Sequence, residues 1–130
     1  MDHEAVLAWV SAYERAWREE DLSAVGQLFT ADARYRASPY AESLVGHEAI
    51  RSIWLSDGGE TFSSQAELIA LEDRRAVVQL VVRYGDPVRQ EYRDLWLLRF
   101  ADDGRVSDFE EWAYWPDRSH LAPGDRTVGQ

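Results

Sequence analysis

The hydrophobic pattern changes its period once along the chain, and this change constrains the fold more than any other feature. Up to about residue 55, apolar residues recur at helical spacing, and from Thr61 onward they alternate with polar residues as in β-strands. Turn residues divide the second part into four segments, at about 61–71, 75–84, 90–100 and 105–115. Helices followed by closely connected strands predict an α+β fold in which helices cover one face of an antiparallel sheet.

Two helices are expected at the start of the chain. Apolar residues recur at helical spacing over about residues 4–19, opposite a charged face, and Asp2 can cap the first turn. Asp21 can cap a shorter second helix, whose apolar stripe continues to Phe29. The short connection between them predicts a helical hairpin.

A turn, a brief strand and a third helix follow. Residues 30–32 are expected to form the turn out of the second helix, and a short or edge strand covers 33–37 because Pro39 follows closely. Gly46 opens a third helix that ends before residues 57–59, where two glycines stand together.

Composition bounds the possible functions. The 130 residues suit a single domain, expected over 1–116, with an irregular tail at 117–130. A net charge of -10, with 14 arginines and no lysine against 24 acidic residues, argues against nucleic acid and anionic membranes as partners. The chain has no cysteine, and its start lacks the basic and apolar run of a secretion signal, so a cytoplasmic location is expected.

Strand parity places one acidic residue on the apolar face of the sheet. In the segment 75–84 the even positions are apolar and form the natural core face. From Tyr92 to Phe100 the even positions are aromatic or aliphatic, apart from Asp94. Asp94 is therefore predicted to point inward among aromatic side chains.

The next hairpin decides which face of the last strand points inward. Asp103 and Gly104 are the preferred residues of a two-residue hairpin loop, which would pair Asp102 with Arg105. On that count Glu111 points inward. A change of one residue in the loop would reverse every assignment on the last strand.

The same count makes two acids neighbours in the interior. Trp96 faces Glu111 and Asp94 faces Ala113, so the two carboxyl groups lie diagonally across the strand pair. Burial and mutual repulsion would keep at least one of them protonated. Such a pair is suited to general acid-base chemistry.

A structural role is the alternative for these residues. A buried carboxyl group is often satisfied by an arginine, a tyrosine hydroxyl or a backbone amide, and from sequence the two interpretations have equal weight. The aromatic residues pose the same choice between core and ligand pocket, although six tryptophans in so small a domain favour a wide apolar pocket. The candidate pocket residues are Tyr13, Trp17, Tyr40, Trp54, Trp96, Phe109 and Trp115.

Other chemistries are not indicated. His3, His47 and His120 are far apart and lack a carboxylate at metal-ligand spacing, so no metal site is predicted. The glycines at 58–59 lack the lysine of a phosphate loop, and no serine lies in a nucleophile elbow. We therefore expect no cofactor.

Several motifs resemble one known family. They are LFTADA (28–33), GHEAI (46–50), YRDLW (92–96) and FEEWAYWP (109–116). With the helix and strand layout, they resemble the SnoaL-like branch of the nuclear transport factor two-like superfamily over about residues 4–116. The resemblance implies a cone in which a strongly curved antiparallel sheet wraps around three helices. It further implies an apolar cavity inside and a homodimer formed through the outer sheet face.

The resemblance also implies a site. Asp94 matches the strand position at which SnoaL-like cyclases and epoxide hydrolases carry a catalytic acid, and Glu111 falls near the second acid of the hydrolases. Tyr92 stands where those hydrolases have an arginine, and the chain has no asparagine to hold their attacking water. These departures argue against epoxide opening by the same residues, although Tyr92 or Tyr40 could donate a proton instead.

Two classes of function remain. The first is a cavity protein for a small, mostly apolar organic molecule, acting as a proton-transfer enzyme of isomerase, cyclase or hydrolyase type. Asp94 would then be the base and Glu111 a second acid or an orienting group, while Tyr92, Tyr40 or Tyr13 stabilises a developing oxyanion. The second class is a noncatalytic ligand-binding or dimeric assembly module with the same cavity.

Overall fold

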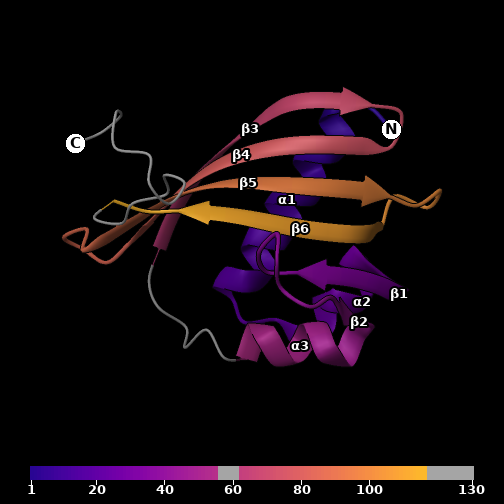
Figure 1. The fold of residues 1–130 in the computed structure, drawn as a ribbon, viewed down its shortest axis with the longest axis horizontal. Coiled ribbons are helices and arrows are strands. Elements are labelled where there is room, and N and C mark those ends of the chain that lie inside the picture. Colours follow the sequence, from indigo (N-terminus) through magenta and orange to yellow (C-terminus); the bar gives the residue numbers. More distant parts are fainter. Residues whose placement is uncertain (56–61, 117–130) are drawn as a thin grey trace, which may run out of the picture.

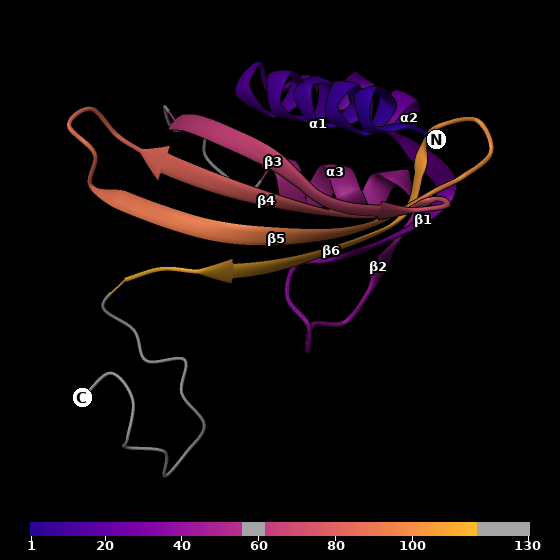
Figure 2. The ribbon, with the colours of Figure 1, turned by 90° about the horizontal axis from the view of Figure 1, so that it is seen from above.

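The helices pack against one face of a curved sheet (Figure 1; Figure 2). The computed structural model describes residues 1–55 and 62–116, so the predicted helix stop at 57–59 and the predicted tail at 117–130 lie outside the described residues. The elements in chain order are α1 (His3–Arg18), η1 (Leu22–Ala24), α2 (Val25–Leu28), β1 (Phe29–Arg36), β2 (Leu44–Val45), α3 (His47–Leu55), β3 (Phe62–Glu72), β4 (Arg75–Tyr84), β5 (Gln90–Phe100) and β6 (Val106–Tyr114).

Helix α1 forms as its sequence predicts. The Asp2 side chain accepts a hydrogen bond from the backbone N–H of Ala5 (2.8 Å) and caps the first turn. The apolar stripe of α1 is buried, and Trp9 Nε1 donates to the carbonyl oxygen of Leu28 (2.9 Å), which ties α1 to α2. The expected bounds 4–19 are confirmed to within one residue at each end.

The sheet contains six strands in the order β2-β1-β6-β5-β4-β3 and is open. Strands β3 to β6 form the antiparallel meander that the short turns predicted. Strand β1 instead runs parallel to β6, because most of the chain separates these two strands and no short turn dictates their direction. The α+β architecture is confirmed, with a curved sheet that is mixed rather than wholly antiparallel (Figure 2).

The predicted second helix and first strand have different bounds in the structure. A 3-10 turn (η1) and a single α-helical turn (α2) precede Phe29, which adopts extended backbone. Residues 30–32, expected as a turn, belong to β1, and the pairing of β1 with β6 shifts between Phe29 and Arg34. Phe29 is fully buried, so packing of its ring overrides the local turn preference. Strand β2, which has only two residues, was not predicted.

The β5–β6 hairpin has the predicted register along most of its length, but its loop is longer than predicted. The backbone N–H of Ala101 donates to the carbonyl oxygen of Arg105 (2.7 Å), so the loop has three residues and the expected pairing of Asp102 with Arg105 is wrong. Gly104 adopts the left-handed φ of 87° that such a loop requires. A register shift next to Phe100 then offsets the longer loop. The confirmed pairs are Leu98–Phe109, Trp96–Glu111 and Asp94–Ala113.

Aromatic rings fill the core between α1 and the inner face of the sheet. The Tyr13 ring stacks on Phe109 with 5.6 Å between centroids and meets Trp96 edge-on at 4.8 Å. Trp9 meets Phe29 edge-on at 5.7 Å. Such pairs add about 0.5–1.5 kcal/mol each beyond simple burial. This packing fixes the inner face of β5, on which Asp94 also lies.

Replacing Gly104 tests the geometry of the hairpin. Nothing lies within 4 Å of an added Cβ, so the cost of a side chain comes from the positive φ alone. We expect Gly104→Ala to lower the free energy of unfolding by about 1 kcal/mol in urea denaturation. Gly26→Ala is the control, because this helical glycine has no positive φ and the added methyl meets only His47 at 3.7 Å. Equal losses in both variants would show that backbone conformation at Gly104 is not the cause.

Candidate functional site

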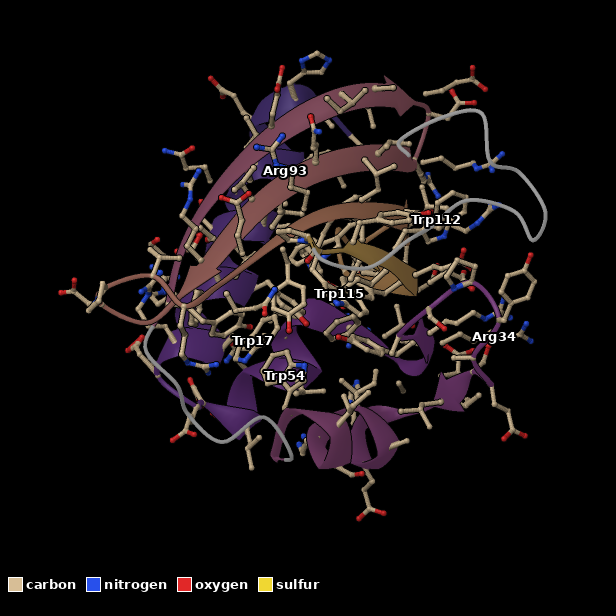
Figure 3. All side chains as sticks on the ribbon, turned by 60° about the vertical axis from the view of Figure 1, so that its left-hand side comes forward. Trp17, Arg34, Trp54, Arg93, Trp112 and Trp115 are labelled. Atoms are coloured by element: carbon tan, nitrogen blue, oxygen red, sulfur yellow. The ribbon has the colours of Figure 1, made fainter. Side chains whose placement is uncertain are left out.

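A pocket of about 360 Å³ lies between α1 and the inner face of strands β3 to β6. Figure 3 looks toward this end of the molecule, with Trp17 on the α1 side. The lining combines aromatic and aliphatic walls with a few polar groups. These residues are Tyr13, Glu14, Trp17, Phe62, Ser64, Leu80, Val82, Tyr84, Arg89, Gln90, Tyr92, Asp94, Trp96, Glu111 and Ala113.

Asp94 is the one buried polar residue in the described part of the chain. Its exposed fraction is 6 %. Burial is the main reason that its pKa rises from 3.8 to about 9. The hydrogen bond with the Glu111 side chain and the negative charge of Glu111 raise the pKa further. Asp94 therefore holds its proton at neutral pH.

Glu111 lies diagonally across the strand pair from Asp94 and is half-buried. Its Oε2 accepts a hydrogen bond from Trp96 Nε1 (3.1 Å). No described arginine contributes to the pKa of Asp94, and Asp94 Oδ1 is buried without a hydrogen-bond partner. The carboxyl pair thus faces the pocket, whose lining also includes Arg89.

Two tyrosines shape opposite sides of the pocket. The Tyr13 hydroxyl lies 2.9 Å from that of Tyr35, and burial, followed by Tyr35 and Glu111, raises the pKa of Tyr13 well above its usual value. Tyr13 therefore remains protonated. The Tyr92 ring meets Trp115 edge-on at 5.7 Å and forms part of the wall beside Asp94.

The structure brings six of the sequence-predicted site residues to the pocket, and four lie elsewhere. The six are Tyr13, Trp17, Tyr92, Asp94, Trp96 and Glu111. Trp54 and Phe109 pack against Tyr13 in the core, and Trp115 packs behind Tyr92. Tyr40 is fully exposed in the connection between β1 and β2, because the turn there carries it away from the interior.

Several pocket residues were not predicted. Phe62 and Ser64 share the inward parity of β3, but most of that strand is exposed and its pattern is weak. Extending the register from β4 would have found Ser64, which pairs with Val82. Arg89 and Gln90 follow a turn, where parity is undefined.

Histidine and acidic side chains do not gather elsewhere in a way that suggests a metal. Among residues 1–55 and 62–116 no three His, Cys, Asp or Glu side chains could together hold a metal ion. His47 Nε2 lies 2.9 Å from the carbonyl oxygen of Phe29, a backbone contact that links α3 to β1. Over the same ranges no helix is long and apolar enough to cross a membrane.

Comparisons with known proteins agree with the fold. The family model described as a SnoaL-like domain matches residues 10–109, and no curated protein matches the sequence. The epoxide hydrolase/cyclase-like enzyme SalBIII, described in pyran ring formation in the polyether salinomycin, has a TM-score of 0.71 at 18% identity, covering 87% of this chain and 93% of that one. A steroid delta-isomerase from Pseudomonas aeruginosa has a TM-score of 0.62 at 23% identity, with coverages of 88% and 82%. An LEH-like epoxide hydrolase from M. tuberculosis has a TM-score of 0.64 at 14% identity, with coverages of 85% and 84%. At these identities the likeness shows the fold alone.

The raised pKa of Asp94 makes the folded protein less stable as pH rises. Between the ordinary pKa near 4 and the folded value of about 9, the unfolded chain has lost a proton that the folded protein retains. Asp94→Asn keeps the shape and removes this titration. We expect the free energy of unfolding of the variant, relative to the parent, to increase from pH 5 to pH 8 by up to about 1.4 kcal/mol per pH unit.

Urea denaturation at several pH values measures this difference. Asp73→Asn is the control, because Asp73 is exposed in the β3–β4 turn and its positive φ suits either residue. Any pH dependence that Asp94→Asn shows beyond this control is assigned to the buried carboxyl group. A pH-independent difference for Asp94→Asn would contradict the buried, protonated state.

Proposed function

Because the chain belongs to the SnoaL-like domain family, we propose that it is a proton-transfer enzyme for a small, mostly apolar organic molecule. The single observation that supports this most is the Asp94–Glu111 pair at the wall of a pocket with several aromatic residues. A protonated and an ionisable carboxyl group side by side can act as acid and base on one substrate. The reaction is of isomerase, cyclase or hydrolyase type.

The environment of the pair assigns the roles in this proposal. The sequence suggested Asp94 as the base, but a carboxyl group with a pKa of about 9 is an acid at neutral pH. Glu111, which accepts the Trp96 N–H, is then the base. The buried Asp94 Oδ1 has no hydrogen-bond partner among the described residues, so in this proposal it is the atom that meets a substrate oxygen.

Proton balance follows from these roles. Glu111 removes a proton from a carbon or hydroxyl group of the substrate, while Asp94 donates its proton to the oxygen on which negative charge develops. In an isomerisation, Glu111 then returns its proton to a second carbon and the enol O–H returns its proton to Asp94. Both carboxyl groups end the cycle as they began, so no other reactant is consumed.

The pocket walls support this chemistry. Trp17, Trp96 and Leu80 provide apolar contacts for the body of a substrate and limit water around the acids. Low solvation also keeps Asp94 protonated, so the same walls serve binding and acidity. Tyr92, which also lines the pocket, would assist the oxyanion in this proposal.

Turnover of two substrate classes tests the proposal. We would assay a β,γ-unsaturated bicyclic ketone for the isomerase reaction and a β-hydroxy ketone on the same ring system for the hydrolyase reaction. For whichever compound reacts, Asp94→Asn and Glu111→Gln should each lower kcat by about 10²–10⁴-fold with a smaller effect on KM. Asp73→Asn should retain full activity.

The dependence on pH provides a second readout. The parent rate should fall as pH rises through about 9, when Asp94 loses its proton. Undiminished turnover by Asp94→Asn would refute the acid assignment. Tight binding of both compounds without turnover would favour a noncatalytic ligand-binding module.

A further inference from the structure

Two buried polar atoms in the pocket have no hydrogen-bond partner in the described structure. One is Asp94 Oδ1, which belongs to the proposed acid, and the other is Ser64 Oγ on β3. Buried hydroxyl groups normally have partners, because leaving one unsatisfied costs free energy. The proposed reaction uses Asp94 but gives Ser64 no role.

The sheet register gives the spacing between Ser64 and Asp94 across the sheet. Ser64 pairs with Val82 on β4, whereas Asp94 on β5 pairs with Leu80. The two residues thus lie two strands apart, which corresponds to about 10 Å across the sheet. Val82 and Leu80 present apolar side chains to the pocket between them.

From this arrangement we infer that Ser64 is a specificity-determining residue that binds an oxygen at the far end of the ligand. The inference rests on the proposed function and names its substrate class. The ligand is an elongated apolar molecule with a hydroxyl or carbonyl oxygen at each end, one at Asp94 and Glu111 and the other at Ser64. The pocket volume of about 360 Å³ is at the small end for organic ligands and suits two linked rings.

A ligand lacking the distal oxygen would leave the Ser64 hydroxyl without a partner, as it is in the described structure, whereas a ligand with that oxygen would satisfy it. Sites that contain such a polar group discriminate strongly against analogues that cannot bond to it. Apolar walls alone would distinguish these molecules poorly, since the body of the ligand is unchanged. Ser64 therefore supplies selectivity while Asp94 and Glu111 supply the chemistry.

Two phenols provide the probes. Calorimetry would compare 4,4′-dihydroxybiphenyl, whose oxygens stand at opposite ends of an apolar body, with 4-hydroxybiphenyl. The parent should bind the diol about 5–10-fold more tightly, as expected for one added neutral hydrogen bond and two equivalent orientations. Ser64→Ala should reduce this preference to about the twofold statistical factor, with little change for the mono-phenol.

Ser63→Ala is the matched control, because Ser63 is exposed on the opposite face of the same strand and pairs with Arg83. It should retain the full preference. Equal affinities for the two phenols in the parent, or an unchanged preference in Ser64→Ala, would overturn the inference while leaving the proposed function intact. Failure of the parent to bind either phenol would count against both.

Discussion

The burial of Asp94 beside Glu111 is the constraint on which the candidate site depends. An ionised carboxylate at this position would be poorly solvated and repelled by Glu111, so the proton is retained to a pKa of about 9. Aromatic packing around Tyr13, Trp96 and Phe109 holds the strands that carry the pair. The fold thus maintains an acid that is costly to ionise, and the proposed function uses this property.

The position of the Asp94–Glu111 pair depends on the backbone conformation of the β5–β6 loop, which lies far from the pair. Glu111 faces inward because a three-residue loop with Gly104 in the left-handed region is followed by a register shift near Phe100. Either change alone would have turned Glu111 to the outer face. The loop of this hairpin therefore determines which face of β6 points into the pocket, although none of residues 100–106 lines it.

Sequence pattern was sufficient for some of this architecture and insufficient for the rest. Strong alternation in β4 and β5 predicted the inward position of Asp94, because one buried face leaves little freedom of register. Glu111 was placed correctly even though the loop length was wrong, since the loop and the register shift offset each other. A register shift between distant strands, such as that between β1 and β6, has no local signal in the sequence.

Residues outside strongly alternating strands were the least predictable. Ser64 lies on β3, where exposure of most positions hides the inward face, and Tyr40 is an aromatic residue that its turn carries into solvent. An aromatic residue was therefore a reliable sign of a pocket wall only on a helix or strand whose apolar face packs against the core. The fold is shared with isomerases and with epoxide hydrolase or cyclase-like enzymes. The polar groups of the pocket must therefore decide the reaction.

The most direct measurement is the titration of the Asp94 carboxyl carbon by ¹³C NMR, assigned by its loss in Asp94→Asn. A buried acid that is hydrogen-bonded to Glu111 should have a pKa far above the ordinary value, at about 9. Titration near pH 4, as for an exposed aspartate, would contradict the buried proton and with it the acid role of Asp94.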